Sequence, residues 1–98
     1  MFVVFYHWRL KPGTEEAFRA AWTRLTKAIR SRYGSQGSRL HRAEDGTWWA
    51  YAQWPTREAW EKADGGVADP EAANAMKECV SERFFAVTAD VTDDLLGK

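Results

Sequence analysis

The chain has 98 residues, enough for one domain with a two-layer core and too few for two domains. It carries 14 lysine and arginine residues against 14 aspartate and glutamate residues, so no net charge draws it to nucleic acid or to a membrane surface. No apolar stretch approaches the roughly 20 residues of a membrane span, and no secretory leader pattern stands at the N-terminus. We therefore expect a single cytoplasmic domain over residues 1–98 that binds neither nucleic acid nor membrane.

The first two predicted elements are a strand and a long helix. Residues 2–10 are rich in β-branched and aromatic side chains, which is typical of a strand. The more apolar face of this strand carries Phe2, Val4, Tyr6, Trp8 and Leu10. After a break at Lys11-Pro12-Gly13, apolar residues recur at helical spacing from Thr14 to about Tyr33, and Gly34 ends the helix.

Two further strands are predicted around a tight turn. Residues 38–43 and 47–54 flank Asp45-Gly46, a pair that predicts a two-residue hairpin and antiparallel pairing. One face of the second of these strands carries Trp48, Ala50, Ala52 and Trp54. The two alanines leave a gap between the tryptophans, and either a ligand or a packed helix would fill that gap.

Two shorter helices are predicted in the second half of the chain. Thr56 is a good first residue for a helix over residues 56–64, and residues 65–68 are expected to be a flexible break. Asp69 caps the next helix, with Pro70 at its first position, where the missing N–H costs nothing. The buried side of this helix is expected to extend to Val80.

A last strand over residues 84–91 completes the order β-α-β-β-α-β. One of its faces would carry Phe85, Val87, Ala89 and Val91. This order predicts an α+β, ferredoxin-like fold. Right-handed crossovers would place the first and third strands in the middle of a four-stranded antiparallel sheet, with both helices on one face.

The face of the sheet away from the helices is also expected to be apolar. It would carry Val3, Phe5, Trp49 and Tyr51, a patch too large to leave in water, with His7 beside them. A second copy laid face to face would cover this patch, so the sequence predicts a homodimer.

Motifs spread along nearly the whole chain resemble the antibiotic biosynthesis monooxygenase (ABM) domain family. The matching residues are Lys11-Pro12-Gly13, Glu15-Glu16-Ala17-Phe18, Asp45-Gly46, Tyr51-Ala52-Gln53-Trp54, Glu58-Ala59-Trp60 and Ala68-Asp69-Pro70. The resemblance implies a dimeric α/β barrel. Some family members oxidise anthrones or quinols with O₂ and without metal or flavin, other relatives cleave haem, and many have no assigned activity.

Compared residue by residue, the resemblance to the anthrone-oxidising members is mixed. A tryptophan stands at Trp54, as in those members, and their strand histidine matches His41. Their strand asparagine falls at Ala50, and their helix arginine falls near Met76, with Lys77 adjacent. The two departures remove a hydrogen-bonding group and a cation that would stabilise a developing phenolate.

The haem-cleaving members match less well. Their first-strand asparagine falls at Tyr6, and residues 69–81 contain no histidine to serve as an axial ligand. The single cysteine, Cys79, allows neither a disulfide nor a CxxC metal site. The sequence therefore predicts neither a bound metal nor another cofactor.

Four residues are candidates for a site between the helices and the sheet. Tyr6, Trp54 and Trp60 would wall the pocket and contact the ligand, although core packing alone would also explain each of them. His41 would lie near the mouth as a general base, because an imidazole suits deprotonation of a phenol, unless it is a surface residue.

Three hypotheses for the function follow. The first is a cofactor-independent monooxygenase that acts on a small aromatic or quinol-type substrate. The alternative is a non-catalytic dimer that binds a small ligand or is associated with stress; a third reading, a purely structural dimer, would need a filled core beside Trp54.

Overall fold

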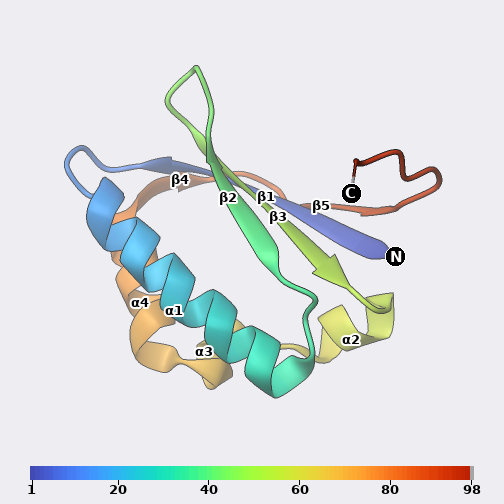
Figure 1. Cartoon of the computed structure of the whole chain (residues 1–98). Coiled ribbons are helices and arrows are strands. Elements are labelled where there is room, and N and C mark those ends of the chain that lie inside the picture. Colours follow the sequence, from blue (N-terminus) through green and yellow to red (C-terminus); the bar gives the residue numbers. More distant parts are fainter. Residues whose placement is uncertain (98) are drawn as a thin grey trace.

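One antiparallel sheet covered by helices on a single face forms the architecture of the computed structural model, which describes residues 1–97 (Figure 1). The strand segments are β1 Phe2–Leu10, β2 Ser38–Arg42, β3 Trp48–Trp54, β4 Val80–Arg83 and β5 Val87–Asp90. Their order in the sheet is β2-β3-β1-β4, with β5 also paired to β1. The predicted α+β, ferredoxin-like fold is confirmed, including the central positions of the first and third strands.

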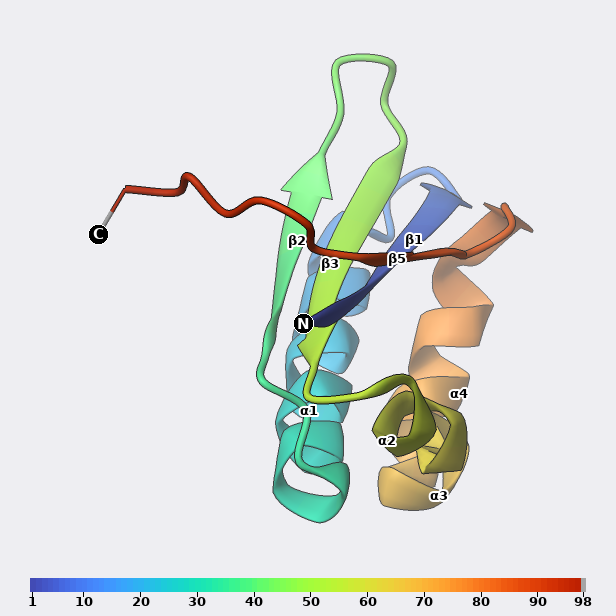
Figure 2. The same ribbon diagram turned by 90° about the vertical axis from the view of Figure 1, so that its right-hand side faces the viewer.

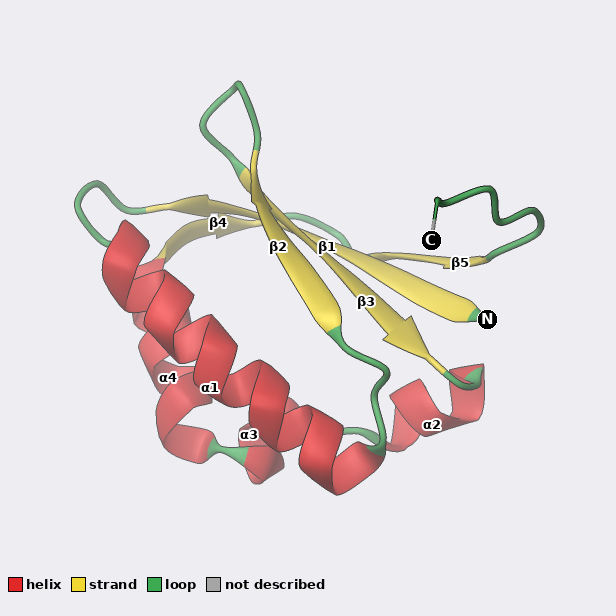
Figure 3. Ribbon diagram, in the orientation of Figure 1, coloured by secondary structure: helices red, strands yellow, loops and turns green. Residues whose placement is uncertain are grey.

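The helices form the second layer (Figure 3). They are α1 Glu15–Tyr33, α2 Arg57–Lys62, α3 Gly65–Ala68 and α4 Pro70–Cys79. Helices α1 and α4 lie side by side on the same face of the sheet (Figure 2). Gly34 ends α1 in the left-handed conformation, at φ 75°, and its N–H donates to the carbonyl of Arg30. The predicted cap of α4 is confirmed, because the Asp69 carboxylate accepts from the N–H of Ala72.

The chain between α2 and α4 is more regular than its sequence indicated. Residues 65–68, expected to be a flexible break, form α3, and the Asp64 carboxylate accepts from the N–H of Gly66 at its start. Helix α4 ends at Cys79, so the expectation that Val80 belongs to it is wrong. Val80 instead lies opposite Leu10 in the sheet, because pairing with β1 gives its backbone hydrogen-bonding partners that a further residue of the helix would lack.

The last predicted strand is divided into β4 and β5, which explains five strand segments where four were expected. Trp8 lies opposite Arg83 and Phe5 lies opposite Val87, so three steps along β1 match four steps along the edge strand. One extra residue therefore forms a β-bulge, which reverses the alternation of faces beyond it. The expectation that Phe85 shares a face with Val87 is wrong, and Phe85 is 96% exposed.

The hairpin between β2 and β3 is also longer than predicted. The N–H of Ala43 donates to the carbonyl of Thr47, which leaves a loop of residues 44–46 in place of the expected two-residue turn. Gly46 has a φ of 85°, the conformation that such loops require at their last position.

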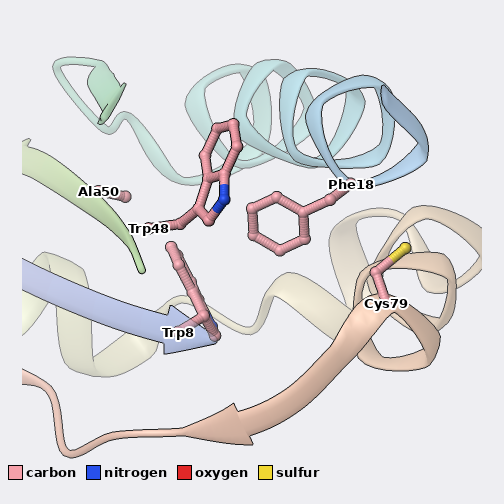
Figure 4. Close-up of a cluster of buried hydrophobic side chains, with 5 residues drawn as sticks. All are labelled: Trp8, Phe18, Trp48, Ala50 and Cys79. Atoms are coloured by element: carbon pink, nitrogen blue, oxygen red, sulfur yellow. The ribbon is translucent and has the colours of Figure 1, made fainter. Parts of the chain in front are cut away.

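The core between sheet and helices consists of two clusters. One, shown in Figure 4, contains Trp8, Phe18, Trp48, Ala50 and Cys79. The other contains Phe2, Val4, Ala52 and Trp54. Phe18 meets both Trp8 and Trp48 edge to face, with ring centroids 5.3 Å and 6.1 Å apart. These edge contacts fix how closely α1 approaches the sheet at this end.

Candidate functional site

A cavity of about 760 Å³ lies between the helix-facing side of the sheet and the helices. Its walls come from β1, β2, β3 and β4 on one side and from α1, α3 and α4 on the other. Aromatic and aliphatic lining residues include Tyr6, Trp8, Trp22, Leu25, Ile29, Trp54 and Met76. The size and the apolar lining are those of a site for a small organic molecule.

Tyr6 gives this cavity a neutral hydrogen-bond donor. Its hydroxyl oxygen accepts from the indole N–H of Trp60, at 3.0 Å, and its own O–H has no acceptor within residues 1–97. Burial raises the pKa of the Tyr6 hydroxyl, and this outweighs the opposite effects of the Trp60 hydrogen bond and the charge of Arg83. Tyr6 therefore keeps its proton at neutral pH and can donate it to a ligand.

Trp54 is a second donor without a partner. It lies at the end of β3, lines the cavity and is only 3% exposed. Its indole Nε1–H is buried and has no acceptor in the described part of the chain. An unpaired buried donor costs about 1–3 kcal/mol, and a ligand oxygen that reached it would recover that energy.

Trp60 contacts the wall residue Tyr6 but is not itself part of the wall, where the sequence predicted it. It lies on α2 and is not among the residues that line the cavity. Its ring centroid is 5.7 Å from that of Phe2, and its N–H fixes the orientation of the Tyr6 hydroxyl.

The predicted gap beside the tryptophans exists at one alanine only. Ala52 lines the cavity next to Trp54. Ala50 is enclosed in the cluster of Trp8 and Phe18, where helix α1 fills the space above it. Strand alternation places both alanines on the same face and cannot show which of them a helix covers.

His41 lies in a neighbouring hollow and not among the lining residues of the main cavity. This second hollow, of about 440 Å³, runs between α1 and the edge strand β2, and shares Trp22 and Ser38 with the main cavity. His41 is exposed, and its Nδ1 lies 3.3 Å from the carbonyl oxygen of Trp49. Its expected position at the mouth of the main cavity is therefore not found.

Charged residues also line the cavity, and apart from Lys77 sequence reasoning left them out. They are Asp64, Lys77, Glu82 and Arg83. They belong to α3, α4 and β4, so only the fold brings them together, and no short sequence motif connects them.

In residues 1–97 no cluster of three histidine, cysteine or acidic side chains has the geometry of a metal site. The same residues contain no helix long and apolar enough to cross a membrane.

A profile of the family described as antibiotic biosynthesis monooxygenase matches residues 1–77. The chain belongs to this family. A search among curated proteins finds no match. Solved structures of similar fold support the ABM assignment at the level of architecture.

Three of these structures illustrate the likeness. Rv0793 from Mycobacterium tuberculosis has a TM-score of 0.74 at 14% identity, with 97% of this chain and 98% of that chain covered. The N63A mutant of SnoaB, a cofactor-independent oxygenase from Streptomyces nogalater, has a TM-score of 0.73 at 17% identity, with 96% and 95% covered. A conserved protein from Methanosarcina mazei Go1 has a TM-score of 0.73 at 12% identity, with 90% and 89% covered.

Proposed function

We propose that this ABM-family protein is a cofactor-independent monooxygenase for a small planar phenol or quinol. The observation that carries the proposal is the Tyr6 hydroxyl, an unpaired donor on a cavity of about 760 Å³, next to the wall residue Trp54, whose indole N–H is buried and unpaired. Both lack an acceptor within residues 1–97. A flat aromatic ring suits the apolar lining, and its oxygen substituents supply the missing acceptors.

The two donors would act on the charge that develops during reaction with O₂. When a phenol or enol transfers electrons to O₂, it passes through an oxyanion, and donors held in a fixed position stabilise that oxyanion more than they stabilise the neutral form. For an anthrone, the ring methylene becomes a carbonyl. One oxygen atom of O₂ enters that carbonyl, and the other leaves as water with the two methylene hydrogens.

The test of this function is oxygen uptake with anthrone and with 1,4-dihydroxynaphthalene, measured against spontaneous oxidation in the same buffer. The parent protein should accelerate uptake. Tyr6→Phe removes one donor and keeps the ring, Trp54→Phe removes the other and leaves a smaller aromatic ring in the wall, and each should lower kcat/KM by about tenfold to a hundredfold. Tyr51→Phe is the matched control, because the Tyr51 hydroxyl accepts from Gln53 on the other face of the sheet.

Binding without oxygenation is the second candidate function. Ala50, which stands where the anthrone-oxidising members have asparagine, is enclosed in the core and offers no polar group to the cavity. His41, the expected general base, lies outside the cavity lining. Ligand binding with no oxygen uptake above the spontaneous rate would establish this alternative and refute the monooxygenase.

We also propose that the protein is a homodimer formed through the sheet face opposite the helices. This face is less exposed than the sequence indicated, because Val3 is already buried within one chain. Trp49 and Val87 remain 38% and 55% exposed there. The His7 ring lies stacked against Trp49 on this face, with ring centroids 3.7 Å apart.

Light scattering should give twice the chain mass of 11.2 kDa at micromolar concentration, since covering this face would bury on the order of 2,000 Å² in total. Val87→Glu places a charge on the exposed face and should give a folded monomer. Val67→Glu is the control, because Val67 is similarly exposed but lies on α3, among the helices. A parent protein that is monomeric would refute the dimer.

A further inference from the structure

We propose that the cavity takes its aromatic ligand as an anion, and that Arg83 on β4 sets this preference by holding the negative charge. The inference rests on the proposed function only in that the ligand occupies this cavity. It adds a substrate class, ionised aromatic acids such as hydroxyquinones and acidic phenols, and a residue that selects it.

The position of Arg83 in the sheet directs it to the cavity. Arg83 lies opposite Trp8, and residues directly opposite in antiparallel strands share a face, so both are on the helix-facing side. Both residues line the cavity. The bulge that follows Arg83 means that the alternation of β5 could not have shown this orientation.

Arg83 also lacks a competing carboxylate. Within residues 1–97 it forms no ion pair, whereas each of the following arginines does: Arg9, Arg24 and Arg42. Lys77, on the opposite wall of the cavity, likewise has no ion pair in the described chain. Two solvent-exposed cations therefore border the ligand space with no carboxylate of the described chain within ion-pair distance.

The carboxylates of the two acidic lining residues each contact a group other than the lining cations Lys77 and Arg83. Glu82 lies opposite Arg9, and its carboxylate is 3.7 Å from the Arg9 guanidinium, an ion pair on the other side of the sheet from Arg83. Asp64 accepts from the N–H of Gly66, and the start of α3 depends on that bond. Neither carboxylate lies within ion-pair distance of Arg83 or Lys77, so both cations remain available to an anionic ligand.

The charge of Arg83 already acts on the one titratable hydroxyl inside the cavity. Its guanidinium lowers the pKa of Tyr6, in opposition to the larger effect of burial. A ligand oxygen hydrogen-bonded to Tyr6 would lie in the same field. Because that oxygen is ionised at neutral pH and Tyr6 is not, the field stabilises the bound ligand and leaves Tyr6 as its donor.

The test compares two ligands of nearly equal shape, 2-hydroxy-1,4-naphthoquinone, which is ionised at neutral pH, and 2-methoxy-1,4-naphthoquinone, which cannot ionise. Dissociation constants come from isothermal titration calorimetry with the full chain. We expect the hydroxy compound to bind more tightly. Arg83→Gln should weaken its binding about three- to tenfold and leave the methoxy compound unchanged, and Arg83→Lys should restore most of the loss.

Arg39→Gln is the matched control, because it removes the same charge from an exposed residue that lines only the second hollow. It should leave both affinities unchanged, and raised salt should weaken only the hydroxy compound. Equal binding of the two compounds, or equal effects of Arg83→Gln and Arg39→Gln, would overturn the inference while the aromatic site stands. Binding of neither compound would overturn both the inference and the proposed site.

Discussion

Replacing Phe18 with alanine is expected to lower the free energy of unfolding by about 3–5 kcal/mol. Phe18 has no exposed surface and meets both Trp8 and Trp48 edge to face. Two large indoles on neighbouring strands cannot collapse into the space that the ring leaves, so most of the cavity would persist. In a domain whose total stability is about 5–15 kcal/mol, this loss brings the protein close to unfolding.

Urea denaturation followed by circular dichroism measures the effect of this substitution. Phe85→Ala removes the same atoms from a side chain that is 96% exposed, and should change the stability by less than about 0.5 kcal/mol. If the two substitutions cost the same, Phe18 does not organise the core in the way described.

Replacing Ala52 with leucine is expected to weaken ligand binding at least about tenfold while changing stability little. Ala52 lines the cavity beside Trp54, so the added carbons would enter the space where a planar ligand stacks. A side chain that fills a true void gains van der Waals contacts with the atoms lining it and introduces little strain. The measurement is titration with 2-hydroxy-1,4-naphthoquinone, together with thermal unfolding of the same sample.

Ala50→Leu is the matched control for this experiment. The residue type and the face of β3 are the same, but Ala50 is enclosed by the core cluster shown in Figure 4. Overpacking there should cost about 1–3 kcal/mol of stability, and the remaining folded protein should bind normally. Retained affinity in Ala52→Leu, or equal stability losses in the two variants, would show that Ala52 does not border a ligand site.

Local sequence patterns predicted most of the elements because they depend on short-range chemistry. The glycine after Tyr33, the Asp69-Pro70 pair and the alternation of residues 2–10 each act on the backbone within a few residues. The order of elements then led to the ferredoxin-like fold, since crossover handedness leaves few alternatives. The two cavity residues that the sequence did identify, Tyr6 and Trp54, lie on the strand faces predicted for them.

Interactions between distant segments decided the rest. Val80 is a strand residue because Leu10 lies opposite it, and the bulge before β5 arises from pairing with β1. Helix α1 covers Ala50, whereas Ala52 is also buried but borders the cavity, although alternation treats the two alike. The sequence by itself determined most of the elements, their order and the aromatic face of β3. The tertiary structure alone determined which part of that face borders the cavity and that Arg83 borders it too, because both depend on contacts between residues far apart in the chain.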